Sequence, residues 1–318
     1  MIKRILKLLI CLTAVCCLLS SAPAGAAGGA FRYQKIKITD DAVPVMNIAG
    51  FKTTHLISEQ ETLLDIARDY GLGFNEIELL HPDIDPWLPP EGKTIEIPLM
   101  WALPTTSHEE VVINIPEMRL YRFFPGHNLV KTYPIGIGRQ GMDTPITDTK
   151  VATRIKDPDW TVPPESRDKM GVAIVPPGPS NPLGNRWIGL ALDQLGIHGT
   201  NFAWGIGRRV SQGCIRMYPE HVESFFNEVS LGTTVEIIYE PVKIGIRDNT
   251  IFVEIHPDIH NIFPDMYSHA ESLLDERGLL RGVDREKLGR AVGEQNGMPQ
   301  PVGIIAKTLT KNEKGGEK

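Results

Sequence analysis

The spacing of hydrophobic residues between positions 54 and 98 predicts a small unit of two strands and two helices. Four apolar residues recur at the interval of one helical face: Leu63, Ile66, Ala67 and Tyr70. This spacing indicates an amphipathic helix, and the Gly71 that follows is a typical helix end. A strand before this helix, a second helix at residues 75–80 and an alternating strand at residues 93–98 complete the pattern. The unit is therefore expected to have the order βααβ.

From residue 109 onwards the pattern is that of strands separated by turn residues. The apolar runs cover residues 111–115, 118–123, 129–138 and 151–155. Residues 158–184 are rich in proline and glycine, which predicts an ordered loop that walls a substrate site, with a plain connector as the alternative. The next run, residues 187–197, predicts a strand that ends at His198. We expect a mainly β domain, a β-sandwich, over residues 109–240.

The last part of this domain contains a helix and a strand, and a smaller α/β extension follows it. Pro219 suits a first helical turn, His221 is expected to face solvent, and the apolar face comprises Val222, Phe225, Phe226 and Val229. A strand is expected at residues 234–238. The extension, residues 241–311, combines a hairpin turning at Asp248-Asn249 with helices near 269–277 and 285–292. The charged tail, residues 312–318, is predicted to be disordered.

The first 27 residues have the pattern of a secretory signal peptide. Positive charges at Lys3, Arg4 and Lys7 precede an apolar run over residues 8–19, and small residues at 22–27 form a cleavage region. A retained signal-anchor is the alternative. Cleavage would place the protein in the periplasm. It would also remove three of the four cysteines of the chain and leave only Cys214.

Composition and charge narrow the class of function. The 318 residues are 42% hydrophobic and 23% charged, as expected for globular domains, and the net charge is −6. This acidic balance, with no basic stripe beyond the N-terminus, argues against nucleic acid as a partner. Cysteine and histidine are also zinc ligands, but the chain lacks the closely spaced ligand pairs of a zinc site. No metal or other cofactor is expected.

The residues around Cys214 suggest a nucleophile, although a buried structural cysteine is the alternative reading. Gly213 permits a tight turn that presents the thiol together with backbone N–H groups, which could hold an oxyanion. His198, at the end of a predicted strand, could take the thiol proton. Ser211 adds a hydrogen-bond donor, and the charge of Arg216 favours a thiolate.

These residues resemble the signature of a known family. His198-Gly199-Thr200, followed by Ser211-x-Gly213-Cys214-Ile215-Arg216-Met217, is similar to the L,D-transpeptidase catalytic domain of the YkuD type. Three further stretches also match: Gly136-Ile137-Gly138, Thr144-Pro145 and Asn181-Pro182-Leu183-Gly184. Gln212 stands where the family commonly has histidine.

The resemblance implies an enzyme that acts on peptidoglycan stem peptides through a thioester. Cys214 would be the nucleophile and His198 its base, with Gly213 and Ser211 in the catalytic turn. The residues expected to bind substrate are Arg216, Gly199 and Thr200. Release of the terminal D-Ala and attack by another stem would give a 3-3 crosslink. Other family members attach an outer-membrane lipoprotein to the wall, or hydrolyse the stem as L,D-carboxypeptidases, and the sequence does not separate these acceptors.

Residues 54–98 resemble a LysM module, the family that binds the glycan of peptidoglycan. The matching positions are Thr62-Leu63, Ile66-Ala67, Tyr70-Gly71 and Ile95-x-Ile97-Pro98. The implied partner is therefore peptidoglycan, through both its stems and its glycan. A wall-binding protein with a silent catalytic domain is the remaining alternative, and the intact set of residues around Cys214 argues against it.

Overall fold

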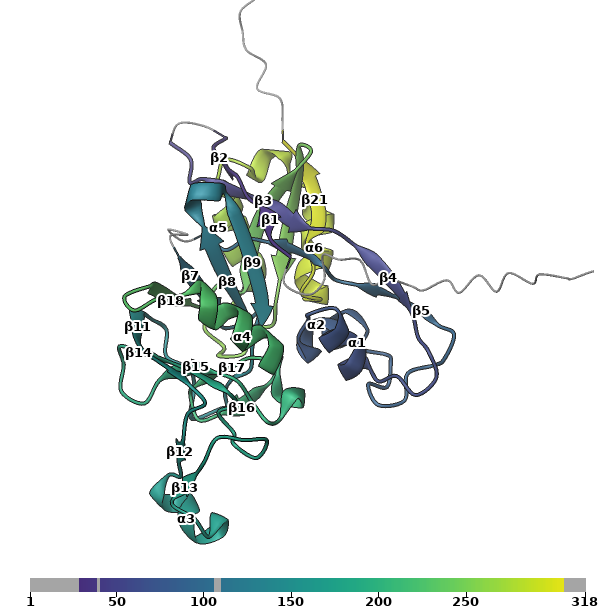
Figure 1. Cartoon of the computed structure of the whole chain (residues 1–318). Coiled ribbons are helices and arrows are strands. Elements are labelled where there is room, and N and C mark those ends of the chain that lie inside the picture. Colours follow the sequence, from purple (N-terminus) through teal and green to yellow (C-terminus); the bar gives the residue numbers. More distant parts are fainter. Residues whose placement is uncertain (1–28, 39–40, 106–109, 306–318) are drawn as a thin grey trace, which may run out of the picture.

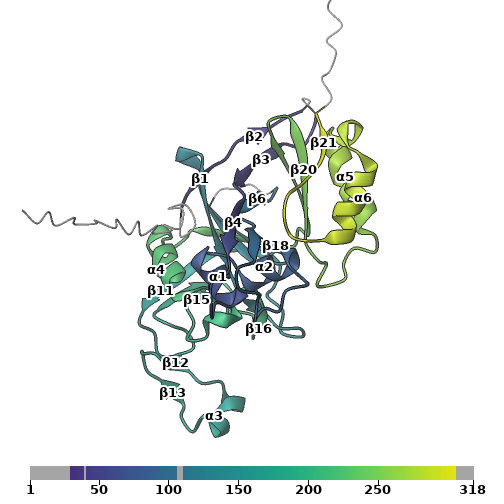
Figure 2. The ribbon, with the colours of Figure 1, turned by 90° about the vertical axis from the view of Figure 1, so that its right-hand side faces the viewer.

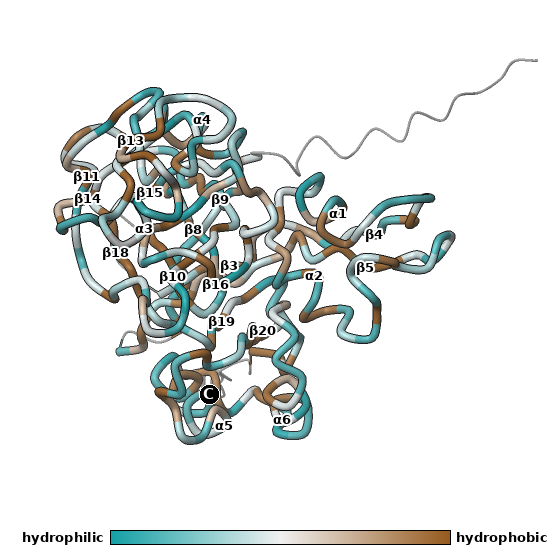
Figure 3. The backbone as a smooth tube through the Cα atoms, turned by 90° about the horizontal axis from the view of Figure 1, so that it is seen from below, coloured by the Kyte–Doolittle hydropathy of each residue, from teal (hydrophilic) through white to brown (hydrophobic). Residues whose placement is uncertain are grey.

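The computed structural model of the chain describes residues 29–38, 41–105 and 110–305 (Figure 1). The predicted signal peptide, residues 1–27, and the predicted disordered tail, residues 312–318, lie outside these ranges. Within them, no helix is long and apolar enough to cross a membrane. Seen from below, the chain forms three lobes: a large strand domain, a helical module to one side and a C-terminal lobe with α5 and α6 (Figure 3).

The strand domain is built on a nine-stranded sheet in the order β1-β9-β8-β7-β18-β11-β14-β15-β17. Its strands are β1 (Phe31–Arg32), β7 (Val111–Asn114), β8 (Arg119–Phe124), β9 (Leu129–Pro134), β11 (Thr147–Lys156), β14 (Arg186–Leu190), β15 (Gly196–His198), β17 (Ile215–Arg216) and β18 (Thr234–Ile238). The long strand β11 pairs with β18 through its first half and with β14 through its second half, with a register shift between Val151 and Thr153. Such irregularities bend a sheet. The sheet curls around one apolar core, and the predicted mainly β fold is confirmed.

Helix α4 (Pro219–Glu228) closes this core with the predicted apolar face, whose four residues are all buried there. The expectation that His221 faces solvent is wrong. Its side chain is only 7% exposed and lies edge-on between the rings of Tyr133 and Tyr218. The reason is helical geometry, because His221 is one turn before the buried Phe225 and therefore lies on the same side of the helix. Burial lowers the pKa of His221 to about 4.

The module has the predicted order β4 (Thr53–Leu56), α1 (Leu63–Asp69), α2 (Phe74–Leu80), β5 (Thr94–Ile97). Its two strands pair antiparallel, and its helices pack on them around a core of their own. Helix α1 begins at a capping box in which Thr62 and Asp65 satisfy each other's backbone N–H groups. The contact of α2 with the strand domain includes a backbone hydrogen bond from Phe74 N to Ile206 O, 3.2 Å long.

The C-terminal lobe has a second sheet, in the order β2-β3-β19-β20-β21, with β6 paired to β3. Its elements are β2 (Lys35–Ile36), β3 (Val45–Gly50), β6 (Met100–Ala102), β19 (Val242–Arg247), β20 (Thr250–Ile255), β21 (Gln300–Ile304), α5 (Met266–Glu276), α6 (Arg285–Glu294) and a 3-10 turn at Leu280–Gly282. The predicted hairpin turns at Asp248 and Asn249, which both have positive φ. Helices α5 and α6 lie against this sheet (Figure 2). Strands from before and after the module therefore complete the sheet of the extension.

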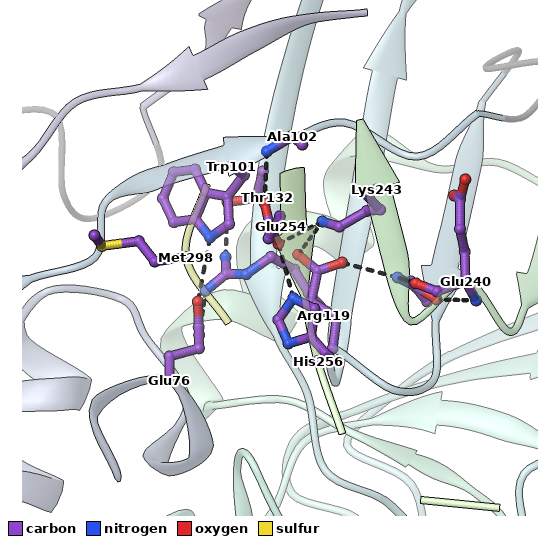
Figure 4. A network of polar contacts seen from close by, with 12 residues as sticks. Glu76, Trp101, Ala102, Arg119, Thr132, Glu240, Lys243, Glu254, His256 and Met298 are labelled. Carbon is purple, nitrogen blue, oxygen red and sulfur yellow. Dashed lines mark hydrogen bonds and ion pairs between the residues drawn. The ribbon is translucent and has the colours of Figure 1, made fainter. Parts of the chain in front are cut away.

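A buried polar network joins the three lobes (Figure 4). Glu76 of α2 forms an ion pair of 2.5 Å with Arg119 of β8, and both side chains are buried. Lys243 of β19 places its ammonium 2.7 Å from the carboxylates of both Glu117 and Glu254. These ion pairs fix the module and the extension to the strand domain, because a charge left unpaired in the interior is costly.

The Glu76–Arg119 pair gives a stability prediction. We expect Glu76→Ala to lower the free energy of unfolding by about 3–5 kcal/mol, since it leaves Arg119 buried and unpaired. Urea unfolding of the whole chain measures this loss. The matched control is Glu78→Ala on the exposed side of the same helix, for which a change within about 0.5 kcal/mol is expected. Equal effects of the two substitutions would contradict this role of the pair.

Candidate active site

Two strands bring His198 and Cys214 to the same part of the sheet. Strand β15 pairs in parallel with β17, with Ile197 opposite Ile215 and His198 opposite Arg216. Both isoleucines are buried in the core. Because side chains alternate along a strand, His198 and Arg216 lie on the other face, and Cys214 precedes β17 on that same face. The predicted base, nucleophile and cation are therefore neighbours.

The residues from Ser211 to Cys214 form a tight turn. Gly213 has a φ of +110°, a conformation that L side chains rarely adopt. Its N–H donates to Ser211 Oγ over 3.2 Å, and Ser211 Oγ donates to the carbonyl oxygen of Cys214 over 2.5 Å. Ser211 thus holds the turn together. The Gly213 N–H is already bonded, whereas the Cys214 N–H has no partner among the described residues and is available for an oxyanion.

Cys214 lies between two cavities. The larger, of about 680 Å³, is lined by Trp160, Trp187, Gln194 and Gln212 among others. The smaller, of about 310 Å³, is lined by Arg139, His198, Ser211 and Arg216 among others. An acyl donor and an acyl acceptor could therefore approach the thiol from two sides.

The loop at residues 158–184 forms a wall of both cavities. Trp160, Pro163 and Leu183 line the two of them. The loop contains β12 (Trp160–Thr161), α3 (Pro164–Met170) and β13 (Ile174–Val175), which project from the body of the domain (Figures 1 and 2). This arrangement agrees with a wall beside a substrate site and not with a plain connector.

His198 is held as a neutral base. Its side chain is 4% exposed and stacks on Trp187, with ring centroids 5.7 Å apart. Burial, and next the positive charge of Arg216, lower the pKa of His198 to about 4. Nδ1 lies 2.6 Å from the carbonyl oxygen of Gly199, which favours the tautomer with its proton on Nδ1, and the backbone of Leu183 also bonds to the ring. The lone pair is then on Nε2, which can accept a proton.

Cys214 is a thiol in this site. Its Sγ donates to the carbonyl oxygen of Gln194 over 3.3 Å, and no hydrogen bond among the described residues joins Sγ to His198. Burial raises the pKa of the Cys214 thiol, and a backbone hydrogen bond from Gly196 and the charge of Arg216 offset this only in part. The charge of Arg216 lowers the pKa of the thiol, as expected, but desolvation is the larger effect. The resting pair is a thiol and a neutral imidazole.

The three residues predicted to bind substrate lie in different places relative to Cys214. Arg216 lines the smaller cavity with Arg139. Gly199 packs against Gly184 and supplies the carbonyl that orients His198. Thr200 lines a different cavity of about 280 Å³, where its hydroxyl accepts the N–H of Phe202. Gly199 and Thr200 thus contribute to the shape of the site and do not line the cavities at Cys214.

Four residues at the site were not among the functional candidates predicted from the sequence. They are Arg139, Thr144, Trp187 and Gln194. Of these, only Thr144 lies in one of the stretches that resemble the family signature. A separate cluster of possible metal ligands comprises Glu117, Glu254 and His256, and it is buried away from Cys214. The ammonium of Lys243 already binds both of its carboxylates.

Comparison with known proteins identifies the family. The model of the L,D-transpeptidase catalytic domain family, YkuD, matches residues 108–237. Probable L,D-transpeptidase YcfS of Escherichia coli K12 is 37% identical, over 80% of this chain and 85% of that protein. Probable L,D-transpeptidase YbiS of the same strain is 40% identical, over 73% of this chain and 80% of that protein. The chain belongs to the L,D-transpeptidase family.

Proposed function

We propose that this L,D-transpeptidase acts on peptidoglycan tetrapeptide stems through a thioester at Cys214. The observation that carries the proposal is the position of the Cys214 thiol between two cavities, one of which also contains His198. In the first step Sγ attacks the carbonyl carbon before the terminal D-Ala, while His198 Nε2 takes the thiol proton. The Cys214 N–H stabilises the oxyanion. His198 then returns the proton to the leaving D-Ala amine.

The second step transfers the acyl group to an acceptor. The side-chain amine of another stem attacks the thioester carbonyl, loses a proton to His198 and displaces the Cys214 thiolate, which is reprotonated. This gives a 3-3 crosslink. A water molecule in place of the amine would give a tripeptide, and an amine of a wall-linked outer-membrane lipoprotein would attach that protein to the wall. The two cavities support a transfer because they leave room for both reactants.

The experiment is incubation with purified disaccharide-tetrapeptide, followed by mass spectrometry of the products. Crosslinking predicts a dimer together with free D-Ala, and hydrolysis predicts a tripeptide with free D-Ala. Adding an amine-bearing peptide of the lipoprotein as a competing acceptor tests the third outcome. If the folded protein releases no D-Ala under any of these conditions, the proposed reaction is wrong.

We propose that Arg216 binds a carboxylate of the stem peptide in the smaller cavity. Its charge lies beside Cys214, and Nε is buried with no hydrogen-bond partner among the described residues. Arg216→Lys should not restore binding, because an ammonium does not reproduce the planar guanidinium fork. We expect kcat/KM for a stem tetrapeptide to fall about 10- to 100-fold in both Arg216→Lys and Arg216→Ala.

The control for Arg216 is a stem with a C-terminal amide in place of the carboxylate. The parent should prefer the free acid, and Arg216→Ala should lose that preference if the residue binds the terminal carboxylate. Steady-state kinetics on the two stems measure the ratio. An Arg216→Ala enzyme that keeps the parent's preference would rule out this carboxylate as the partner.

We further propose that the module binds the glycan of peptidoglycan. Support comes from Trp87, which is 44% exposed on the loop before β5 and contacts Trp204 of the strand domain, with ring centroids 5.1 Å apart. Flat exposed rings suit the apolar faces of sugars. Trp87→Ala should weaken retention on insoluble sacculi severalfold and leave turnover of soluble stems unchanged, since tethering affects only local concentration. Unaltered retention would contradict the proposal. Deleting residues 54–98 is a poorer test, because it would also remove Glu76 and leave Arg119 without its ion-pair partner.

We also propose that the protein works in the periplasm after removal of residues 1–27. The support is the positively charged start, apolar run and small-residue region of that segment. N-terminal sequencing of the protein from a periplasmic fraction tests both points. A full-length protein that fractionates with the cytoplasm would contradict them.

A further inference from the structure

The hydroxyl of Thr144 lies directly behind the catalytic turn. Thr144 is 2% exposed, and its Oγ donates to the carbonyl oxygen of Gly213 over 2.8 Å. The same oxygen accepts the backbone N–H of Gly138 over 3.0 Å. A hydroxyl has a single proton, so these two contacts settle the direction of both hydrogen bonds. This side chain therefore links the turn at Gly213 to a loop 69 residues earlier in the chain.

The hydrogen bond to Gly213 also sets the direction of the next amide. The chain has no cis peptide bond in its described part, so the Gly213 carbonyl and the Cys214 N–H point in opposite directions in one plane. Holding the carbonyl oxygen on the Thr144 side directs the N–H away from Thr144. Such a restraint matters here, because glycine at a φ of +110° does not limit the rotation of this peptide as other residues would.

Two other backbone groups of the turn are already engaged by Ser211. Its hydroxyl binds both the Gly213 N–H and the Cys214 carbonyl, whereas the Cys214 N–H has no hydrogen-bond partner among the described residues. A backbone N–H without a partner is uncommon unless it serves a ligand or lies open to solvent. In the proposed reaction this N–H faces the carbonyl oxygen that becomes negative.

The loop that carries Thr144 is fixed on its outer side. Asp143 Oδ1 lies 2.7 Å from Arg209 Nη2 and 3.3 Å from His260 Nε2, and the Arg209 side chain also donates to the carbonyl oxygen of Ile259 over 3.3 Å. His260 and Ile259 belong to the C-terminal extension. The extension thus braces the loop against which the catalytic turn rests.

We infer that Thr144 is a positioning residue, whose hydroxyl orients the Gly213–Cys214 peptide so that the Cys214 N–H stabilises the oxyanion formed during acylation. The inference rests on the proposed function in one respect, namely that Cys214 is acylated. It does not depend on which acyl donor or acceptor the enzyme uses. A preorganised donor of this kind acts only when negative charge develops on the carbonyl oxygen.

The test compares two reactions of the same thiol in Thr144→Val, Thr144→Ser and the parent. With p-nitrophenyl acetate, Cys214 Sγ attacks the ester carbonyl through an oxyanion, giving an S-acetyl enzyme and p-nitrophenolate. With iodoacetamide, Sγ displaces iodide from a saturated carbon, and no oxyanion forms. Valine has the shape of threonine without the hydroxyl. We expect Thr144→Val to slow acetylation about 10- to 100-fold and to leave alkylation within about twofold of the parent.

Thr144→Ser is the matched variant that keeps the hydroxyl, and its acetylation rate should stay within about threefold of the parent. Thermal unfolding of all three proteins checks that each is folded. An equal fall in acetylation and alkylation in Thr144→Val would assign the residue a general structural role and overturn the inference. Unchanged acetylation would overturn it as well. A parent that reacts with p-nitrophenyl acetate but not with stem peptides would refute the proposed function and leave this inference standing.

Discussion

Replacing Cys214 by alanine is expected to abolish D-Ala release from stem tetrapeptides, with a fall in kcat of at least about four orders of magnitude. The reason is that Cys214 supplies the only thiol among the described residues. The Ser211 hydroxyl is bonded to the backbone of the turn. The other three cysteines of the chain precede residue 28 and fall within the predicted signal peptide. Coupled detection of free D-Ala measures the rate.

The fold should tolerate this change. Cys214 is partly buried, and the polar contacts of its side chain are with the backbone of Gln194 and Gly196. Circular dichroism and thermal unfolding of Cys214→Ala should therefore match the parent. Cys214→Ser is expected to be equally inactive, because a hydroxyl is far less acidic than a thiol and His198 is a weak base here. Turnover of Cys214→Ala within tenfold of the parent would remove the thioester from the mechanism.

The second large effect is expected for His198→Gln, which should lower kcat/KM about 10²- to 10⁴-fold. Glutamine can still donate to the carbonyl oxygen of Gly199, but it cannot take the thiol proton. The parent should depend on pH in a specific way. The base must be unprotonated, and its lowered pKa of about 4 means that it remains so well below neutral pH. The acid limb of kcat/KM should therefore lie near pH 4.

A histidine with its ordinary pKa of about 6.5 would place this limb more than two pH units higher. Measurement of kcat/KM between pH 3 and 8 separates the two cases, because at pH 5.5 the parent should keep nearly all of its activity. In His198→Gln the residual activity should lack this limb. A limb centred near pH 6.5 in the parent, or one that survives in His198→Gln, would assign the base to another group.

The resting site constrains how the thiol is activated. Burial raises the pKa of Cys214 and lowers that of His198, so proton transfer between them is unfavourable before a substrate is bound. Proton removal must then accompany attack on the carbonyl, when the charge moves to an oxygen held by the Cys214 N–H. This places the oriented amide, and with it Thr144, at the centre of the acylation step.

Features that depend on local spacing were predictable from the sequence. The helical face of α1, the βααβ order of the module and the strand character of the main domain all follow short periodic patterns. The proximity of His198 and Cys214 was predicted from a motif. In the structure, the parallel pairing of β15 with β17 brings the two residues together. The prediction for His221 was wrong although the local spacing held the answer, since its position one turn before Phe225 places it on the inner side of α4.

Features that depend on long-range pairing were not predictable. The strands β2, β3 and β6 come from before and after the module, yet they pair in the sheet of the C-terminal extension, and no local pattern indicates their partner. The burial of Lys243 is explained only by the two carboxylates that approach it from β20 and the residues before β8. The link from Thr144 to Gly213 likewise joins segments whose separation in sequence hides their contact.

The most direct test of the mechanism is intact-protein mass spectrometry after rapid acid quench of the parent with a stem tetrapeptide and no acceptor. The account predicts a transient adduct equal to the donor without D-Ala, located by proteolysis to the peptide that contains Cys214 and absent in Cys214→Ala. D-Ala release with no adduct at any quench time, or an adduct on a different residue, would contradict the account.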